Sequence, residues 1–268
     1  NLALIKTYNT NSQVSDSAGT ISAILTGEKT SIGVSGITSN VARDDCAAAL
    51  ANTLPTIAEL AEDAGMATGV VSTARITHAT PAGAFAHTPN RDWEDSASTP
   101  DEAEALGCID IAQQLIQMPN GDGLDVILGG GRGQFLPTDA NDPEYPKRSG
   151  RRDDGRNLIE EWLAQDATRQ YVWNGEDFAA LAGQQGKIAG QVMGLFEPSH
   201  MKFDTDRAED PGAEPSIAAM TEFAVSQLEA KAKARGTGYF LLVEAGRIDH
   251  AHHISNAYRA LEDTVALS

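Results

Sequence analysis

The chain has 268 residues, and 41% of them are hydrophobic, which is enough to bury one large core or two small ones. Its formal net charge of −18 at pH 7 argues against nucleic acid as a partner, because phosphate backbones require a basic surface. No stretch is long and apolar enough to span a membrane, and no signal peptide opens the sequence.

The N-terminal part contains the first candidate functional segment. Residues 2–8 are apolar and predict the end of a strand or helix, and residues 21–27 have helical spacing closed by a glycine. Ser17 is therefore expected at or near a helix N-terminus, where unpaired N–H groups and the helix dipole favour an alkoxide or a bound phosphate. The commoner role of such residues is structural, with Asp16 or Ser17 serving only as the N-cap. Both interpretations stay open at this point.

A helix followed by an apolar strand recurs three times along the chain. The helix–strand pairs are residues 56–64 with 67–73, residues 109–118 with 125–129, and residues 217–234 with 239–243. This rhythm predicts an α/β fold with a mainly parallel central sheet, helices on both faces, and active groups at the carboxyl ends of the strands.

Polar residues follow the first two predicted strands. His78 and Thr80 stand two apart, which suits two ligands from an irregular loop, although a lone histidine is more often structural. Arg91 is able to bind a phosphate through two N–H groups, although an arginine is more often part of a surface ion pair. Residues 129–133 (GGGRG) lack the lysine and Ser/Thr of a P-loop, so they predict a turn that ends a strand.

Between residues 137 and 214 the strand–helix rhythm breaks down. This region is rich in Asp, Gly and Pro and predicts a surface lobe on the core, with one helix at residues 158–164. Its scattered acids could bind calcium, but most such acids are simply solvated, and no EF-hand spacing is present.

Residues 239–253 carry the strongest local signal for a metal site. The apolar run 239–243 predicts a buried strand, and it is followed by Glu244, Asp249 and three of the chain's six histidines. If the chain becomes helical after Asp249, then Asp249 and His253 share one face and can hold one ion. The alternative, a polar turn with solvated histidines, is less consistent with the strand, the two acids and the spacing.

The two cysteines, Cys46 and Cys108, are too few for a zinc–thiolate site and leave either a disulfide or two free thiols. A bridge would contribute on the order of 4 kcal/mol in the chain-entropy model and would place the protein outside the reducing cytosol. Composition does not choose between the two.

Taken together, several segments closely resemble the alkaline phosphatase family, in family order and along the whole chain. They are residues 14–20 (VSDSAGT), 78–83 (HATPAG), 86–93 (AHTPNRDW), 126–132 (VILGGGR), 194–198 (GLFEP) and 243–253 (VEAGRIDHAHH). The detail is similar to the animal-type branch and its bacterial relatives, because the best-known enteric form has aspartate and lysine where this chain has His78 and His250. Two departures are Ile21, where the family has a small residue, and Ala245, where it has glycine.

The resemblance implies hydrolysis of small phosphate monoesters through a phosphoserine, at a site with two zinc ions and one magnesium ion and with an alkaline optimum. Ser17 would be the nucleophile and a zinc ligand. Arg91 would clamp the phosphate with the help of Asp16, and His250 would contact the phosphate. Asp249 and His253 would bind the other zinc ion. Glu244 and Thr80 would hold the magnesium, with His78 either as a further ligand or next to the ligands.

The resemblance also implies features outside the reaction centre. Cys46 and Cys108 match a family disulfide, and the family is found outside the cytoplasm and as homodimers. An animal-type calcium site would use Glu144, the Phe196 carbonyl, Glu197 and Glu214, although the family has aspartate at the last position and Asp210 lies nearby.

The remaining family ligands are absent from this sequence. The family takes one zinc ligand from a Gly-Asp-Gly strand end upstream, two from a Thr-Ala-Asp-His segment downstream, and one from a final histidine. We therefore expect residues 1–268 to be a partial catalytic domain, an internal fragment that lacks both ends and is inactive alone. The alternatives are a non-catalytic metal- or phosphate-binding relative, or a phosphodiesterase of the same superfamily. A sulfatase is excluded because its Cys/Ser-x-Pro-x-Arg context is absent.

Overall fold

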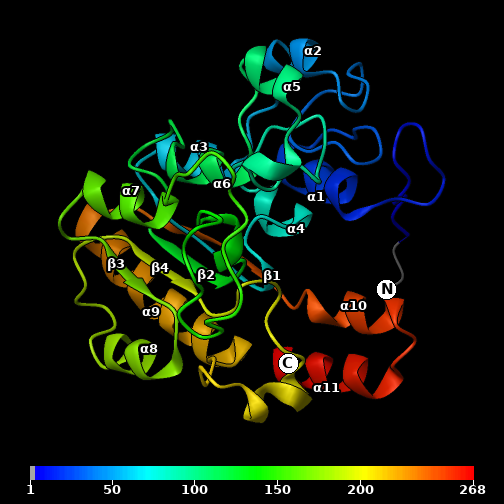
Figure 1. Ribbon diagram of the computed structural model, residues 1–268. Coiled ribbons are helices and arrows are strands. Elements are labelled where there is room, and N and C mark those ends of the chain that lie inside the picture. Colours follow the sequence, from blue (N-terminus) through cyan, green and yellow to red (C-terminus); the bar gives the residue numbers. More distant parts are fainter. Residues whose placement is uncertain (1–3) are drawn as a thin grey trace.

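The computed structural model describes residues 4–268, and its centre is a five-stranded sheet in which all neighbouring strands are parallel (Figure 1). The strand order is β3-β4-β2-β1-β5. The strands are β1 (Ala67–Arg75), β2 (Val126–Gly130), β3 (Gln170–Val172), β4 (Val192–Leu195) and β5 (Tyr239–Glu244).

Helices precede, join and follow these strands. The α-helices are α1 (Ser17–Thr26), α2 (Cys46–Leu50), α3 (Ile57–Asp63), α4 (Ala79–Ala82), α5 (Asp101–Ala105), α6 (Ile111–Ile116), α7 (Leu158–Gln165), α8 (Gly175–Ala182), α9 (Ile217–Arg235), α10 (Arg247–His253) and α11 (Ala257–Leu267). Three short 3₁₀ helices are η1 (Ser96–Ser98), η2 (Arg132–Gln134) and η3 (Asp204–Glu209).

Apolar side chains leave both faces of the sheet, and each face has its own core. Val70, Ile127 and Met193 are paired neighbours on one face and pack with residues of α3, α6 and α7. Val71 and Leu128 belong to the opposite face, where α8 and α9 supply the other half of the core (Figure 1). The predicted α/β sandwich is therefore confirmed, as are the three predicted helix–strand pairs.

Two sequence expectations are wrong. Residues 137–214 do not lack the strand–helix rhythm, because they contain β3, α8 and β4, and β4 pairs directly with the central strand β2. Residues 4–8 have no regular structure, so the strand or helix end predicted for residues 2–8 is not found there, and residues 2 and 3 lie outside the described part of the chain.

The strands end at one edge of the sheet, because all of them are parallel. This carboxyl edge gathers the loops that follow Arg75, Gly130, Leu195 and Glu244, and these loops carry most of the predicted site residues. Across residues 4–268, none of the helices combines the length and the apolar character that a membrane span requires.

Candidate active site

The N-terminus of α1 presents Ser17 beside a capping carboxylate. Asp16 is the N-cap, and its side chain accepts hydrogen bonds from the backbone N–H groups of Ala18 (3.3 Å) and Gly19 (3.1 Å). Ser17 is the first residue of the helix, is half-buried, and has no side-chain hydrogen bond within residues 4–268. The two interpretations of this segment therefore apply to different residues: Asp16 caps the helix, and the Ser17 hydroxyl stays available at its positive end.

Asp16 also holds Arg91. The Nη1 group of Arg91 donates to Asp16 Oδ2 at 3.1 Å, and Asn9 donates to the other carboxylate oxygen at 2.8 Å. Burial raises the pKa of Asp16, but hydrogen bonds from the Gly19 backbone, from Asn9 and from Arg91 outweigh it, and the pKa ends below its ordinary value. One ionised carboxylate thus holds both the Arg91 guanidinium and the first turn of the helix that begins at the candidate nucleophile, Ser17.

Three half-buried histidines form a cluster, and one of them, His78, contacts Arg91. The ring centroid of His200 is 4.1 Å from that of His250 and 5.1 Å from that of His78, and nitrogens of all three lie within 4.8 Å of one another. His78 and His250 were predicted at the site, whereas His200, in the loop after β4, was not. Its only sequence signal was its position three residues after the Phe196–Glu197 pair at another strand end.

Arginine groups lie against each of these rings. Arg91 donates to Nε2 of His78 (3.2 Å) and Arg247 to Nδ1 of His250 (3.0 Å). Arg75 contacts both nitrogens of His200, with its backbone nitrogen 3.1 Å from Nδ1 and its Nη1 2.7 Å from Nε2. Burial, followed by these neighbouring positive charges, lowers the pKa of His78 to about 3 and that of His250 to about 4, and also lowers that of His200. The rings are therefore neutral. Because Nδ1 of His250 accepts a hydrogen bond, its proton is on Nε2, which can donate to a substrate oxygen.

Glu244 ends β5 opposite Ser72 of β1 and is almost buried. The Ser72 hydroxyl donates to Glu244 Oε2 at 2.6 Å. Burial raises the pKa of Glu244, hydrogen bonds from Ser72 and Thr80 oppose this, and the net shift is upward. Carboxylate and hydroxyl oxygens are the donors that magnesium prefers, so Glu244 and Thr80 fit the predicted ion. Ser72, which the sequence did not single out, orients this carboxylate.

Asp249 and His253 share one face of α10, as their spacing predicts. His253 Nε2 lies 3.3 Å from Asp249 Oδ2, and the two side chains are 75% and 61% exposed, respectively. One carboxylate oxygen and one imidazole nitrogen fit zinc in chemistry but supply only two of the four ligands of a tetrahedral site.

A second group of carboxylates lies where β4 ends. Glu144, Glu197 and Asp210 bring oxygens within 4.8 Å of one another, and Glu214 donates its backbone N–H to Asp210 Oδ2 at 2.8 Å. Burial and mutual repulsion raise the pKa of Glu197 to about 7 and that of Glu214 to about 8. Hard oxygen donors in this number fit calcium. Asp210 therefore lies among the residues predicted for the calcium site. Phe196, predicted there through its carbonyl, directly precedes Glu197, and its side chain is fully buried.

Two cationic side chains already lie in this carboxylate group. Lys202 Nζ is 2.6 Å from Glu197 Oε1, and Arg132 donates to Glu144 at 2.9 Å while pairing with buried Asp142. Arg132 belongs to the GGGRG segment, which is the predicted strand-ending turn, with Gly131 in the left-handed region at φ 98°.

Known proteins similar to this chain identify its family. The family model described as alkaline phosphatase matches residues 1–268. The chain belongs to the alkaline phosphatase family.

Several curated alkaline phosphatases are similar to this chain over 99% of its length. The alkaline phosphatase of Gadus morhua is 40% identical over 271 residues, the tissue-nonspecific isozyme of Gallus gallus is 40% identical over 272, and the membrane-bound alkaline phosphatase of Bombyx mori is 41% identical over 273. The matched part is 54%, 50% and 48% of these three proteins, respectively, so the chain spans about half of their length.

Solved alkaline phosphatases share the fold. The Thermus thermophilus enzyme is 29% identical, with a TM-score of 0.71 over 98% of this chain and 44% of that one. The structure from the Antarctic bacterium TAB5 is 23% identical, with a TM-score of 0.68 over 98% of this chain and 60% of that one, and its likeness concerns the fold alone.

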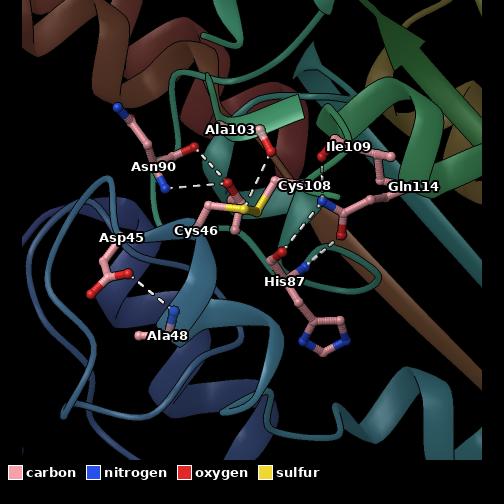
Figure 2. The surroundings of a disulfide bond; sticks show 10 residues. Asp45, Cys46, Ala48, His87, Asn90, Ala103, Cys108, Ile109 and Gln114 are labelled. Carbon is pink, nitrogen blue, oxygen red and sulfur yellow. Dashed lines mark hydrogen bonds between the residues drawn. A yellow bond between two sulfur atoms is a disulfide. The ribbon is translucent and has the colours of Figure 1, made fainter. Parts of the chain in front are cut away.

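The predicted family disulfide is present, between Cys46 of α2 and Cys108 of the loop after α5 (Figure 2). It packs with Trp93, two residues beyond Arg91. Asp44, two residues before Cys46, accepts a hydrogen bond from the Asn90 side chain at 2.6 Å. The disulfide therefore lies close to the segment that carries Arg91, on which both Asn90 and Trp93 lie.

Proposed function

We propose that the protein containing this chain hydrolyses phosphate monoesters through a phosphoserine formed on Ser17. The observation that carries this proposal is the double role of Asp16, which caps the helix that begins at Ser17 and holds Arg91 at 3.1 Å. A nucleophile at the positive end of a helix beside a fixed guanidinium suits attack on a dianionic phosphate.

In the proposed reaction, Arg91 binds two phosphate oxygens and His250 donates from Nε2 to a third. The Ser17 oxygen loses its proton and attacks phosphorus in line as the bond from phosphorus to the alkoxide oxygen breaks, and the alkoxide takes up a proton and leaves as the alcohol. Water later hydrolyses the phosphoserine, which releases inorganic phosphate and restores the Ser17 hydroxyl. His78, held neutral next to Arg91, leaves the guanidinium charge available to the substrate.

Three kinds of ion belong to this proposal. Bound zinc would supply Lewis acidity that makes hydroxyl and water nucleophilic, and magnesium would add positive charge nearby. The residues that would hold the ions are Ser17, Asp249 and His253 for zinc, His78, Thr80 and Glu244 for magnesium, and Glu144, Phe196, Glu197, Asp210 and Glu214 for calcium.

The surroundings of the whole protein are part of the same proposal. The Cys46–Cys108 bridge supports an extracytoplasmic location, because disulfides persist in oxidising compartments. Small phosphate esters would be the substrates and a homodimer the assembly. For residues 1–268 alone we propose a non-catalytic role, because the exposed Asp249–His253 pair offers a zinc ion only two ligands.

Hydrolysis of p-nitrophenyl phosphate by the product of the full open reading frame, with zinc and magnesium, tests the nucleophile. Ser17→Ala should lower kcat by about 10³-fold or more, as loss of a nucleophile does elsewhere. Ser15→Ala, which removes a half-buried hydroxyl two residues away, is the matched control and should stay near the wild-type rate. An inactive wild type, or a Ser17→Ala variant of near-normal rate, would refute the assignment.

A further inference from the structure

A charged groove lies beside the histidine cluster at the carboxyl edge of the sheet. Its volume is about 560 Å³, and it is lined by the end of β1, the loop that follows Arg91, η2, the loop after β4 and residues 147–151. Arg75 forms one wall and also contacts His200 at 2.7 Å, and Asp92 of the opposite wall directly follows Arg91. The groove is thus adjacent to the residues proposed to bind phosphate.

The carboxylates of this groove are all paired with arginines. Glu94 accepts two hydrogen bonds from Arg75, at 2.8 and 2.6 Å. Asp95, which is almost fully buried, accepts from Arg151 at 2.6 Å, and Asp92 accepts from Arg43 at 2.6 Å. None of the three negative charges is left to repel an anion or to pair with a further cation.

Two cations of the groove have no such partner. Lys147 and Arg148 are exposed, and within residues 4–268 neither forms an ion pair with a carboxylate. The Arg148 guanidinium lies 5.0 Å from the centre of the Tyr145 ring, an interaction that leaves its charge uncompensated. In a chain with a net charge of −18, two unpaired cations in one hollow next to a phosphate-binding centre form a local anion-binding surface.

We propose that this groove binds a second anionic group of the substrate, so that the preferred phosphate esters are those whose alcohol portion carries another phosphate. The proposal rests on the proposed function for the reacting phosphate and adds Lys147 and Arg148 as specificity-determining residues. The reacting phosphate lies at Arg91 and Ser17, and the alcohol portion extends over His200 toward the groove.

The test compares hexyl phosphate with hexane-1,6-diyl bisphosphate, which differ only in the second phosphate. Release of inorganic phosphate by the full-length metal-loaded protein gives the ratio of the two kcat/KM values. We expect kcat/KM for the bisphosphate, after correction for its two equivalent ends, to be about five times that for hexyl phosphate at low salt. The ratio should fall as added salt screens the charges of the groove. Lys147→Gln/Arg148→Gln should bring it to about one. The matched control Lys187→Gln/Lys233→Gln removes two exposed lysines outside the groove and should retain it.

Calorimetric titration with hexane-1,6-bisphosphonate and with hexylphosphonate separates the two proposals. If no phosphate is released but the bisphosphonate binds more tightly than the monophosphonate, and only the groove variant loses this preference, the groove is supported and the proposed function fails. The groove proposal is overturned if wild type shows no preference for the second charged group in either kcat/KM or phosphonate affinity. It is also overturned if the control variant loses the preference as much as the groove variant does. Hydrolysis of hexyl phosphate would still support the proposed function in both cases.

Discussion

At the scale of single residues, the same side-chain type takes opposite protonation states in two parts of this molecule. His78, His200 and His250 accept hydrogen bonds from arginines and are neutral. His87 instead places both ring nitrogens against acceptors, Nδ1 at 2.8 Å from the Gly36 carbonyl and Nε2 at 2.7 Å from Glu59 Oε1. An imidazole that donates twice is protonated, so the partners rather than the residue type decide its charge.

We expect His87 to make the stability of the fold depend on pH. Burial lowers the pKa of His87, but the hydrogen bond and the charge of Glu59 outweigh it and raise the pKa above 6.5. A histidine whose pKa is higher in the folded state contributes fully below pH 6.5, and this contribution is lost as pH rises through the folded-state pKa. His87→Gln should cost about 2 kcal/mol at pH 6 and less above pH 8, as measured by urea unfolding.

The control for this prediction is His252→Gln, which changes an exposed histidine and should leave the unfolding curve nearly unchanged at both pH values. An equal loss of stability for His87→Gln at pH 6 and pH 8 would show that the Glu59 contact does not depend on the charge of the ring.

At the scale of elements, the sequence allowed the strands with long apolar runs to be predicted and concealed the short ones. β5 contains the continuous apolar run Tyr239–Val243, and β1, nine residues long, has Val70 and Val71 at its centre and lies between clear helix and turn signals. β3 has three residues, Gln-Tyr-Val, and β4 is Val-Met-Gly-Leu, too short and too mixed to show a period. Their place in the sheet is set by pairing with β2 and with each other, which is tertiary information.

The residues of the candidate site likewise divide into those that could be predicted from the sequence and those that could not. Ser17, Arg91 and Glu244 lie in motifs that the family resemblance covers, so their proximity could be anticipated. His200 and Asp210 lie in irregular loops, and the backbone partner of His200, Arg75, is 125 residues away in sequence. A contact between residues so far apart in the sequence leaves no periodic pattern from which it could be predicted.

The carboxylates gathered near the end of β4 bear on the stability of the fold. Within the described residues, Lys202 and Arg132 are the cations that contact the group formed by Glu144, Glu197, Asp210 and Glu214, so a divalent cation should stabilise the fold. At a calcium concentration 100 times the Kd, the gain is about 2.7 kcal/mol, which would raise Tm by several degrees. Glu197→Ala should abolish the calcium-dependent shift in a thermal melt.

Glu160→Ala serves as the matched control, because Glu160 is an exposed acid on α7 with no ion pair in the described residues. A calcium shift that Glu197→Ala retains, or that Glu160→Ala removes as well, would locate the ion elsewhere.

At the scale of the whole molecule, the chain spans about half of its curated relatives, and its sheet has one incompletely covered side. β1 is buried along nearly its whole length, whereas its neighbour β5, a more apolar strand at the edge of the sheet, is only half-buried. The next elements, α10 and α11, expose Ile254, Leu261 and Val265 by 56%, 66% and 68%. The proposed zinc ligands Asp249 and His253 lie in this same incompletely covered region.

This arrangement predicts weak zinc binding by residues 1–268 alone. Two ligands on one exposed helix face hold an ion far less firmly than a closed tetrahedral set, so the affinity should be on the order of 10³-fold below that of the full open reading frame product. Calorimetric titration with zinc measures both proteins. Asp249→Ala/His253→Ala should remove the remaining binding, and His252→Ala, on the same helix, should not. Equal zinc affinity in the two proteins would mean that residues 1–268 complete the site by themselves, and the proposed ligand set would then be wrong.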